Sequence, residues 1–301
     1  MDKHAVQKAL CQYISDVRLD EPMSEHTSFK VGGPADVLAL PETKEQLLHA
    51  VQTLAAIGCP MFIMGRGTNL LVRSGGIRGA VIKLADNFSG VTVQGEYVTA
   101  QSGTALSALI RSAMGKGLGG AAFLAGIPGT LGGAVTMNAG AYGGEISEVV
   151  DEVYLVSRVG EITLRNEEMR FGYRRSVLSD YPMIVTGARL NLQRVPAKET
   201  KQEVAELAER RREKQPLEYP SAGSTFKRPP GCYAGTMIDQ AGLKGVSVGG
   251  AQVSEKHAGF IINTGNATPE DILNLIALVQ QRVLAAHGVK LEPEVRIVGE
   301  E

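Results

Sequence analysis

The chain has 301 residues, of which 44% are hydrophobic and 21% are charged, and its formal net charge is -1. This composition is typical of a soluble globular protein large enough for two or three hydrophobic cores, and the balanced charge gives no sign of nucleic-acid or anionic-membrane binding. No apolar run approaches the roughly 20 residues of a membrane span, and the start M-D-K-H-A-V-Q-K is not a signal peptide. Three scattered cysteines and five histidines without H-E-x-x-H spacing predict neither disulfides nor a metal site. We therefore expect a cytoplasmic protein without a bound metal.

The first part of the chain predicts a small α/β subdomain. Thr43 and Gln46 form the pattern of a capping box, and the apolar residues after them repeat with the period of a helix until Gly58. The predicted elements are a short amphipathic helix and a connector in residues 1–24, strands at 37–40, 61–64 and 70–72, and a helix that begins after Thr43. Their strand–helix–strand order with short loops is typical of an α/β unit.

A glycine-bracketed turn, G65-R-G-T-N, follows directly after the predicted strand 61–64. Successive N–H groups in such a turn can point at one anion, which makes the turn a candidate nest for a phosphate. Gly and Asn also serve in ordinary turns between strands. From this pattern alone, a plain turn and a phosphate site are equally open.

The next segment contains glycines with the spacing of a dinucleotide-binding fingerprint, but they follow a predicted helix instead of preceding one. Its predicted elements are strands at 80–84, 91–93 and 97–101, and a helix that Thr104 caps and that runs to Met114. Gly115, Gly117 and Gly120 match G-x-G-x-x-G, but they close this helix, whereas the fingerprint follows a strand and opens a helix. No acidic residue follows about 20 positions later in a strand, and no P-loop motif is present. These observations argue against a Rossmann site and a P-loop.

Residues 125–145, A-G-I-P-G-T-L-G-G-A-V-T-M-N-A-G-A-Y-G-G-E, contain seven glycines and no charged residue before Glu145. This composition is unfavourable both for a helix and for a solvated linker. It suits a backbone that packs closely against a flat group and presents N–H groups to it. We therefore expect this stretch to bind a cofactor.

The following residues predict a second sheet and a charged helix. Strands are predicted at 153–156, 162–164 and 183–192 in an antiparallel or mixed sheet. Residues 197–215 form a highly charged helix with a thin apolar stripe, which Pro216 ends. We expect the charges of this helix to serve solvation only.

The last part of the chain predicts a strong helix and a final strand. The helix begins after Thr268, with Pro269 at its first position and two acids in its first turn, and it ends at Gly288. Its predicted apolar face consists of Ile272, Leu275, Ile276, Val279, Val283 and Leu284. Glu294 and Arg296 alternate on the predicted final strand, where they would share one face.

Five motifs, in order, resemble those of the UDP-N-acetylenolpyruvoylglucosamine reductase family, the UDP-N-acetylmuramate dehydrogenases of bacterial peptidoglycan synthesis. They are G65-R-G-T-N-L-L-V, G126-I-P-G-T-L-G-G-A-V-T-M-N-A-G-A-Y-G, F171-G-Y-R-R-S, S221-A-G-S-T-F-K-R-P and L291-E-P-E-V-R-I-V-G. The resemblance implies an α+β fold, with a two-subdomain FAD-binding module of the vanillyl-alcohol-oxidase or PCMH-like type and a C-terminal α+β substrate-binding domain. The implied boundaries are 1–86 and 87–197 for the FAD-binding subdomains, with strand 291–301 returning to the active site, and 198–290 for the substrate-binding domain.

The resemblance also implies the reaction and its residues. NADPH reduces a non-covalent FAD, which then reduces the enolpyruvyl ether of UDP-N-acetylglucosamine to the lactyl ether of UDP-N-acetylmuramate. The implied catalytic residues are Arg174, which stabilises developing negative charge, Ser224, the proton donor, and Glu294, which we expect to be protonated or balanced by neighbouring cations. The implied substrate-binding residues are Lys227, Arg228 and Arg296. The implied FAD-binding residues are Gly65, Arg66, Gly67, Thr68, Asn69, Leu70, Gly126, Ile127, Pro128, Gly129, Gly132, Gly133, Ala134, Asn138, Ala139, Gly140 and Tyr142.

Two departures from the family pattern concern the substrate side. Between Arg175 and Leu192 there is no room for the tyrosine-bearing loop that closes over the UDP end in one group of relatives, so the chain resembles the loop-lacking type II. Arg228 stands where many relatives carry Asn. Two other functions stay open: a flavin-dependent oxidase on the same scaffold, and a non-enzymatic protein that binds a sugar nucleotide. We expect small-molecule substrates, a monomer, and no nucleic-acid or membrane partner.

Overall fold

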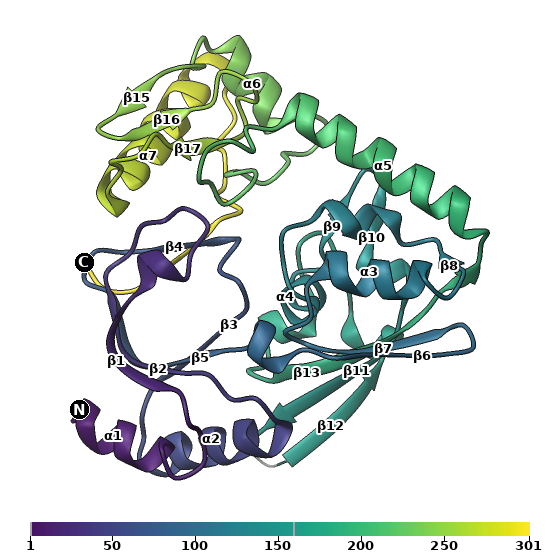
Figure 1. Cartoon of the computed structure of the whole chain (residues 1–301). Coiled ribbons are helices and arrows are strands. Elements are labelled where there is room, and N and C mark those ends of the chain that lie inside the picture. The colour runs from purple at the N-terminus through teal and green to yellow at the C-terminus, as the bar shows by residue number, and fades with distance from the viewer. Residues whose placement is uncertain (1, 159) are drawn as a thin grey trace. The chain divides into compact units, whose positions relative to one another are not determined.

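The structure, a computed structural model, describes residues 2–158 and 160–301 (Figure 1). The chain folds into two units. Unit 1 contains Met1–Leu19, Val37–Arg66 and Gly79–Arg211, and unit 2 contains Asp20–Asp36, Gly67–Arg78 and Arg212–Glu301. Met1, which begins the predicted segment 1–24, lies outside the described residues. Each unit is thus assembled from three separate segments of the chain.

A four-stranded sheet and two helices surround the first core. The elements are α1 (Lys3–Leu10), β1 (Val17–Pro22), β2 (Pro34–Ala39), α2 (Lys44–Ala56), β3 (Met61–Met64) and β5 (Ile77–Lys83). The strand order is β1-β2-β5-β3, with β3 parallel to β5. Leu10 of α1 and Leu47 and Leu54 of α2 are fully buried in one cluster with residues of the strands. The predicted capping box is confirmed, because the Thr43 hydroxyl accepts from the Gln46 N–H at 3.2 Å and the Gln46 side chain accepts from the Thr43 N–H at 3.4 Å.

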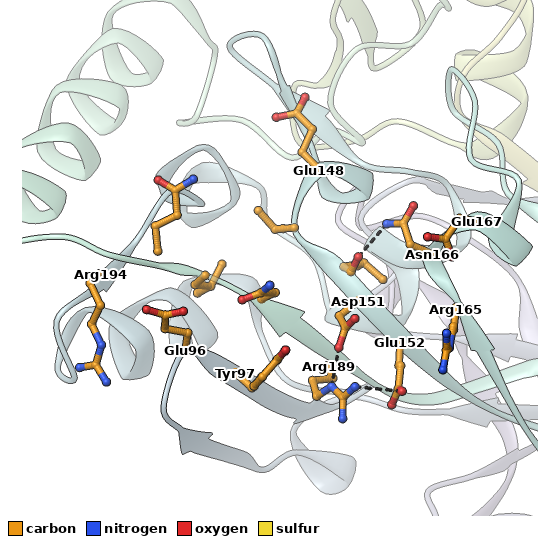
Figure 2. A pocket seen from close by; sticks show the side chains of 15 residues that line it. Glu96, Tyr97, Glu148, Asp151, Glu152, Arg165, Asn166, Glu167, Arg189 and Arg194 are labelled. Carbon is orange, nitrogen blue, oxygen red and sulfur yellow. Dashed lines mark hydrogen bonds and ion pairs between the residues drawn. The ribbon is translucent and has the colours of Figure 1, made fainter.

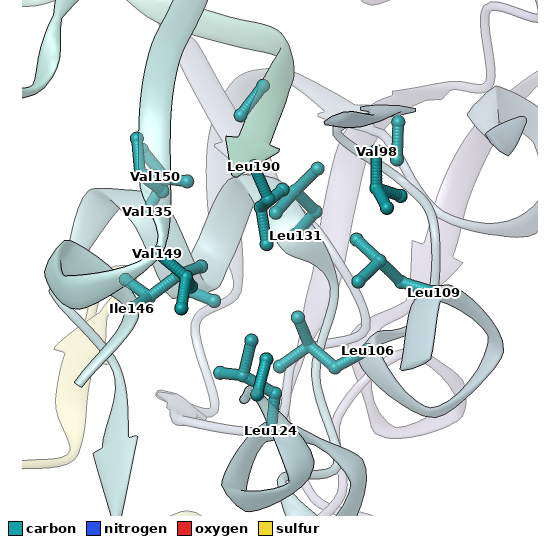
Figure 3. Packing of buried hydrophobic residues seen from close by; sticks show 14 of the residues in the cluster. Val98, Leu106, Leu109, Leu124, Leu131, Val135, Ile146, Val149, Val150 and Leu190 are labelled. Carbon is teal, nitrogen blue, oxygen red and sulfur yellow. The ribbon is translucent and has the colours of Figure 1, made fainter. Parts of the chain in front are cut away.

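A five-stranded antiparallel sheet, in the order β12-β11-β13-β7-β6, lies within unit 1. The elements of this part are β6 (Val91–Gln94), β7 (Tyr97–Gln101), α3 (Leu106–Met114), β8 (Leu118–Gly119), α4 (Leu131–Thr136), β9 (Gly140–Ala141), β10 (Gly144–Glu145), β11 (Val150–Ser157), β12 (Gly160–Arg165), β13 (Ile184–Asn191) and β14 (Gln193–Arg194). Helices α3 and α4 pack on the sheet around fully buried leucines such as Leu106, Leu131 and Leu190 (Figure 3). The antiparallel form of the predicted sheet is confirmed. Helix α5 (Ala197–Lys214) then carries the chain from unit 1 into unit 2, and its predicted position is confirmed.

The prediction that Thr104 caps helix α3 is wrong. The residue before the helix is Ala105, whose side chain makes no capping hydrogen bond. The Thr104 hydroxyl instead accepts from the N–H of Gly90 and donates to its carbonyl, at 3.2 and 3.1 Å. A threonine close to the start of a helix can thus hydrogen-bond a neighbouring loop instead of capping the helix, when that loop offers both a donor and an acceptor.

The prediction that residues 125–145 are unsuited to a helix is also wrong in part, because α4 lies within this stretch. Its Leu131, Ala134 and Val135 are buried against the sheet. Burial of this apolar face outweighs the low helix propensity of Gly132 and Gly133, since tertiary packing supplies most helix stability in proteins.

Unit 2 combines two helices with two small sheets. Its remaining elements are β4 (Leu70–Val72), α6 (Ala234–Gln240), β15 (Ser247–Val248), β16 (Ala251–Val253), β17 (Ile261–Asn263), α7 (Pro269–His287) and β18 (Arg296–Val298). The sheets are antiparallel β15-β16-β17 and a parallel pair of β18 with β4. The Thr268 cap and the Gly288 end of α7 are confirmed.

Two details of the predicted C-terminal region are wrong. Leu284 does not belong to the buried face of α7, since 48% of it is exposed. Glu294 lies before the final strand, which begins at Arg296. Pro293, which has no N–H to offer a ladder, pairs with Phe226 in an isolated bridge, and the chain turns from there into β18.

Within residues 2–158 and 160–301, no helix has both the length and the apolar composition that crossing a membrane requires. In the same ranges, no group of three or more His, Cys, Asp or Glu side chains is placed to bind a metal ion.

Candidate active site

Helix α4 begins in the middle of the predicted cofactor stretch, and its two glycines have different surroundings. A Cβ atom on Gly132 would lie 2.8 Å from the Cβ of Ser102, so packing alone requires glycine there. Gly133 is exposed, and a Cβ atom on it would meet the Thr130 hydroxyl at an ordinary 3.7 Å. No neighbour in the described part of the chain therefore requires glycine at 133. The main chain at the first turn of α4 is available to a flat ligand.

The predicted phosphate turn approaches the cofactor stretch at its first residue. A Cβ atom on Gly65 would overlap the Thr130 hydroxyl, so only glycine allows the two loops of unit 1 to lie this close. The next residue, Arg66, forms an ion pair with Asp86 at 2.6 Å. Two glycine-rich segments far apart in sequence thus form one surface of unit 1.

The rest of that turn, Gly67–Leu70, belongs to unit 2. The Asn69 side chain donates to the carbonyl of Glu294 at 3.1 Å, and the Asn69 carbonyl accepts from the N–H of Arg296 at 2.9 Å. The Gly67 carbonyl accepts from the N–H of Ser28 at 3.2 Å. The turn therefore holds the C-terminal segment that carries two of the predicted site residues.

The hairpin of β9 and β10 places a strained tyrosine in the cofactor stretch. Its two turn residues, Tyr142 and Gly143, have φ values of 55° and 94°. Such a turn favours Asn or Gly, and a bulky residue in it is strained. Because 46% of Tyr142 is exposed, packing does not explain the strain, which points to a functional role. Among the other predicted FAD-binding residues of this stretch, Ala134, Asn138 and Ala139 are buried, Gly126, Ile127, Gly129 and Gly140 are half-buried, and Pro128 is exposed.

Arg174 lies in a tight turn of unit 1. Gly172 and Arg175 exchange two main-chain hydrogen bonds, at 3.0 and 3.1 Å, and Arg174 between them has a φ of 54°. Its Nη2 donates to the carbonyl of Gly140 at 3.1 Å. Its guanidinium carbon lies 5.2 Å from the ring centroid of Tyr173. The turn therefore directs the Arg174 side chain onto the predicted cofactor stretch.

Ser224 and Glu294 lie on neighbouring segments of unit 2. Ser224 is exposed, whereas Thr225 after it is buried. The Thr225 hydroxyl accepts from the Ile261 N–H at 3.1 Å, its N–H donates to the Gly259 carbonyl at 2.8 Å, and its carbonyl accepts from the Glu294 N–H at 2.8 Å. Thr225 therefore anchors the backbone directly after Ser224 and the backbone N–H of Glu294.

The predicted substrate-binding cations of unit 2 are exposed. Lys227 forms an ion pair with Glu292 at 3.2 Å. The guanidinium carbon of Arg228 lies 4.0 Å from the ring centroid of Tyr233, a contact that orients a cation without neutralising it. Arg296 begins β18 beside β4. These three side chains, of which Lys227 is paired with Glu292, lie on the unit that carries Ser224.

A histidine supports the loop beside Thr225. The Nδ1 atom of His257 accepts from the Gly259 N–H at 3.0 Å, which requires an unprotonated Nδ1. Burial lowers the pKa of His257, although a backbone hydrogen bond opposes this, and the charge of Lys244 lowers the pKa further. His257 is therefore the neutral support of the loop that holds Thr225.

Arg211 was not among the predicted site residues, yet its charge does more than solvate helix α5. Burial lowers the pKa of Arg211, while its interaction with Tyr142 raises it. A Cβ atom on Gly126 would lie 3.7 Å from the Arg211 side chain, so this arginine packs on the cofactor stretch. Val204 and Leu207 of the same helix pack on the adjacent core. Their spacing to Arg211 is helical, and this period was the signal that could have identified it.

A depression of about 700 Å³ in unit 1 contains none of the predicted site residues (Figure 2). Arg189 lies there between Asp151 and Glu152, at 2.6 and 2.9 Å. Its guanidinium carbon lies 4.9 Å from the ring centroid of Tyr97. Because these charges pair with one another, the glycine-lined surface is the better candidate for the active site.

The fold defines a class of protein, the FAD-binding flavoproteins. A model of the FAD binding domain matches residues 35–164. The structure of an alkyldihydroxyacetonephosphate synthase shares the fold with a TM-score of 0.50 and 16% identity, over 64% of this chain and 40% of that chain.

The particular family follows from closer relatives. Residues 215–298 match the C-terminal domain of UDP-N-acetylenolpyruvoylglucosamine reductase. The reductase of Caldanaerobacter subterraneus subsp. tengcongensis is 53% identical over 94% of this chain and 93% of its own length, and that of Clostridioides difficile is 50% identical over 95% and 94%. The reductase structure from Thermus caldophilus has a TM-score of 0.81 and 37% identity, over 94% of this chain and 98% of that chain. The chain belongs to the UDP-N-acetylenolpyruvoylglucosamine reductase family.

It is therefore an FAD-dependent oxidoreductase that acts on UDP-N-acetylenolpyruvoylglucosamine in peptidoglycan synthesis, with NADPH as the reductant. The predicted family, α+β flavoprotein fold, reaction and cofactors are confirmed.

Proposed function

We propose that Arg174, Ser224 and Glu294 carry out the chemistry on the enolpyruvyl group. The observation that carries this assignment is the arrangement around Thr225. Ser224 is exposed beside the buried Thr225, and the Thr225 carbonyl accepts from the Glu294 N–H at 2.8 Å. A hydroxyl and a carboxyl group are thereby fixed on directly hydrogen-bonded segments of unit 2.

Each of the three residues has a role that follows from the charge of the reacting group. Bound FAD supplies the hydride that NADPH donates. Hydride addition to the vinyl CH2 carbon leaves an enediolate, and the guanidinium of Arg174 matches its carboxylate oxygens. The Ser224 hydroxyl then protonates the adjacent carbon, since an enediolate is a strong enough base for a weak acid. Glu294 contributes a carboxyl group beside the proton donor Ser224.

We assign the FAD to the surface formed by Gly65, the first turn of α4 and the β9–β10 hairpin. Support comes from Gly133, whose lack of a side chain no described neighbour requires. Further support comes from Tyr142, which is exposed and strained. Main-chain N–H groups at such glycine-rich turns suit a pyrophosphate.

On the substrate side, we assign the UDP diphosphate to the cations that follow Ser224. From Arg175 to β13 the structure contains one 3-10 turn, Val177–Ser179, and no inserted loop. The guanidinium of Arg228 lies over the Tyr233 ring, a contact that orients it. Lys227 and Arg296 complete the proposed set.

We propose that the enzyme works in the cytoplasm as a monomer without nucleic-acid or membrane partners. The near-zero net charge of -1 and the small-molecule substrates of its relatives support this. Size-exclusion chromatography with light scattering, in the presence of FAD, measures the mass directly. A mass twice that of the 31.9 kDa chain would overturn the monomer.

The overall reaction is tested by visible absorption of the purified protein. We expect flavin bands that bleach with NADPH under anaerobic conditions and return only when UDP-N-acetylglucosamine enolpyruvate is added. Bands restored by oxygen alone would indicate an oxidase. A protein that binds the sugar nucleotide but takes up no FAD would indicate a non-enzymatic binding protein.

The residue assignment is tested by Ser224→Ala, measured by half-reactions. Bleaching by NADPH should persist, whereas reoxidation by the enolpyruvyl substrate should slow at least about 100-fold because the proton donor is lost. Ser247→Ala is the matched control, since Ser247 is an exposed serine on β15 of the same unit. If both half-reactions of Ser224→Ala match those of the control, Ser224 is not the acid.

A further inference from the structure

We propose that Asn138 is a positioning residue that fixes the Arg174 turn on the cofactor stretch. The inference rests on the proposed role of Arg174. The family resemblance assigned Asn138 to FAD binding, whereas the geometry gives its side chain a different task.

The side chain of Asn138 joins the two segments directly. Its Nδ2 donates to the carbonyl of Gly172 at 3.1 Å and to the carboxylate of Glu145 at 2.8 Å. Its Oδ1 accepts from the Ser147 N–H at 3.1 Å. Both N–H groups and the carbonyl of the amide are therefore engaged within the protein, and only 1% of Asn138 is exposed.

A second hydrogen bond runs in the opposite direction. Nη2 of Arg174, two residues beyond Gly172, donates to the carbonyl of Gly140, two residues beyond Asn138. The two segments are thus joined by two reciprocal hydrogen bonds. The Asn138 side chain donates to the main chain of the Arg174 turn, and the Arg174 side chain donates to the main chain of the cofactor stretch. Without the hydrogen bond from Asn138 to Gly172, the turn would be held only by the bond from Arg174 to Gly140 and could rotate about it. The guanidinium would then lose its fixed direction.

The environment of Asn138 suits asparagine in particular. Its φ of 45° lies in the left-handed region, where Asn is tolerated better than other non-glycine residues. The carboxylate of Glu145 on one side and the N–H of Ser147 on the other fix which end of the amide carries the donors. The orientation that donates to Gly172 is thereby the favoured one.

A polarity exchange isolates the bond to Gly172. In the double variant Asn138→Asp with Glu145→Gln, the new amide donates to the new carboxylate, the Ser147 N–H keeps its acceptor, and the net charge and side-chain volumes are conserved. At the Gly172 carbonyl, the donation is replaced by repulsion between a carboxylate oxygen and the carbonyl oxygen, so the variant breaks this one bond of the three. We expect FAD uptake and bleaching by NADPH to stay within about twofold of wild type, and reoxidation by the enolpyruvyl substrate to slow about tenfold, as expected for a misplaced binding group.

The decisive readout is a double-mutant cycle with Arg174→Lys. A residue that acts through the guanidinium should have little effect once that guanidinium is gone, so the polarity exchange should change reoxidation less than about twofold in the Arg174→Lys background. Asn166→Ala is the control: Asn166 also bridges two main-chain carbonyls of unit 1, those of Ser147 and Val150, neither of which belongs to the Arg174 turn. We expect it to leave both half-reactions unchanged.

Two results would overturn the inference. One is an equal loss of reoxidation rate in the wild-type and Arg174→Lys backgrounds, which would show a general structural effect. The other is a loss of FAD binding or of bleaching by NADPH in the polarity exchange, which would return Asn138 to the cofactor site. Failure of the proposed function is recognised separately, because Arg174→Lys alone would then leave reoxidation unchanged.

Discussion

The main-chain N–H of Glu294 donates to the carbonyl of Thr225 at 2.8 Å, across 69 positions of sequence. Thr225 is buried and directly follows the exposed Ser224. The proposed proton donor and the proposed carboxyl group are therefore not placed independently, because one buried threonine holds both segments.

Removing the hydroxyl of Thr225 should destabilise unit 2. In Thr225→Val the buried N–H of Ile261 loses its acceptor, and we expect the free energy of unfolding to fall by about 1–3 kcal/mol. Thr225→Ser keeps the hydroxyl and is the control. Urea unfolding of both variants measures the difference. Equal stability of the two would mean that the hydrogen bond to Ile261 contributes nothing.

The two glycines of α4 should respond in opposite ways to alanine. Gly132→Ala places a Cβ atom 2.8 Å from that of Ser102 and should lower apoprotein stability by about 1–3 kcal/mol. Gly133→Ala meets only an ordinary contact and should stabilise the helix by up to about 1 kcal/mol. Because FAD would lie against it, Gly133→Ala should nevertheless weaken FAD binding at least about tenfold.

Urea unfolding of the apoproteins and FAD titration by flavin fluorescence test this pair. Wild-type FAD affinity in Gly133→Ala would remove the first turn of α4 from the proposed cofactor site.

Relieving the backbone strain at Tyr142 should raise the stability of the protein but weaken its binding of FAD. Tyr142→Asn tolerates the φ of 55° and should raise the free energy of unfolding by about 1 kcal/mol, while FAD binding weakens. Tyr142→Phe keeps the strain and should show no gain. Thermal unfolding and FAD titration measure both effects. A stabilised Tyr142→Asn with unchanged FAD affinity would show that the tyrosine does not contact FAD.

The neutral His257 should make stability depend on pH. Because burial lowers its pKa in the folded protein, its contribution to stability is complete above the unfolded pKa of about 6.5 and is lost as the pH falls below that value toward the folded pKa. His257→Gln retains an acceptor for the Gly259 N–H and does not titrate. Between pH 7.5 and 5.5, wild type should lose more free energy of unfolding in urea than His257→Gln. Parallel losses would assign the pH dependence to other groups.

Local sequence patterns were sufficient to predict many of the helices and strands. Strands β3, β4 and β7 have the predicted bounds, because short apolar runs between turn residues mark them, and the capping box of Thr43 lies within four residues. Helix α4 could not be predicted in this way. Its stability comes from burial against a sheet whose strands lie elsewhere in sequence.

In the candidate site, too, local sequence identified residues but not the contacts that they make with distant parts of the chain. The motif around Arg174 indicated the residue, but its hydrogen bond to Gly140 joins positions 34 apart, which no local pattern reveals. The role that the structure suggests for Asn138 depends on Gly172 and Glu145 together. Arg211 was missed because a charged residue at a helical position in an apolar stripe was treated as solvated.

During synthesis on the ribosome, the turn at Gly67–Leu70 is made long before its hydrogen-bond partners. Asn69 emerges early, but its partners at Glu294 and Arg296 follow 225 or more positions later. At about 5–20 residues per second, this interval is on the order of 10–45 s. During that time β4 lacks its parallel neighbour β18, and the apolar segment Leu70–Val72 stays uncovered by it. Nascent chains are thus vulnerable at this strand to chaperone capture or premature association until synthesis nears its end.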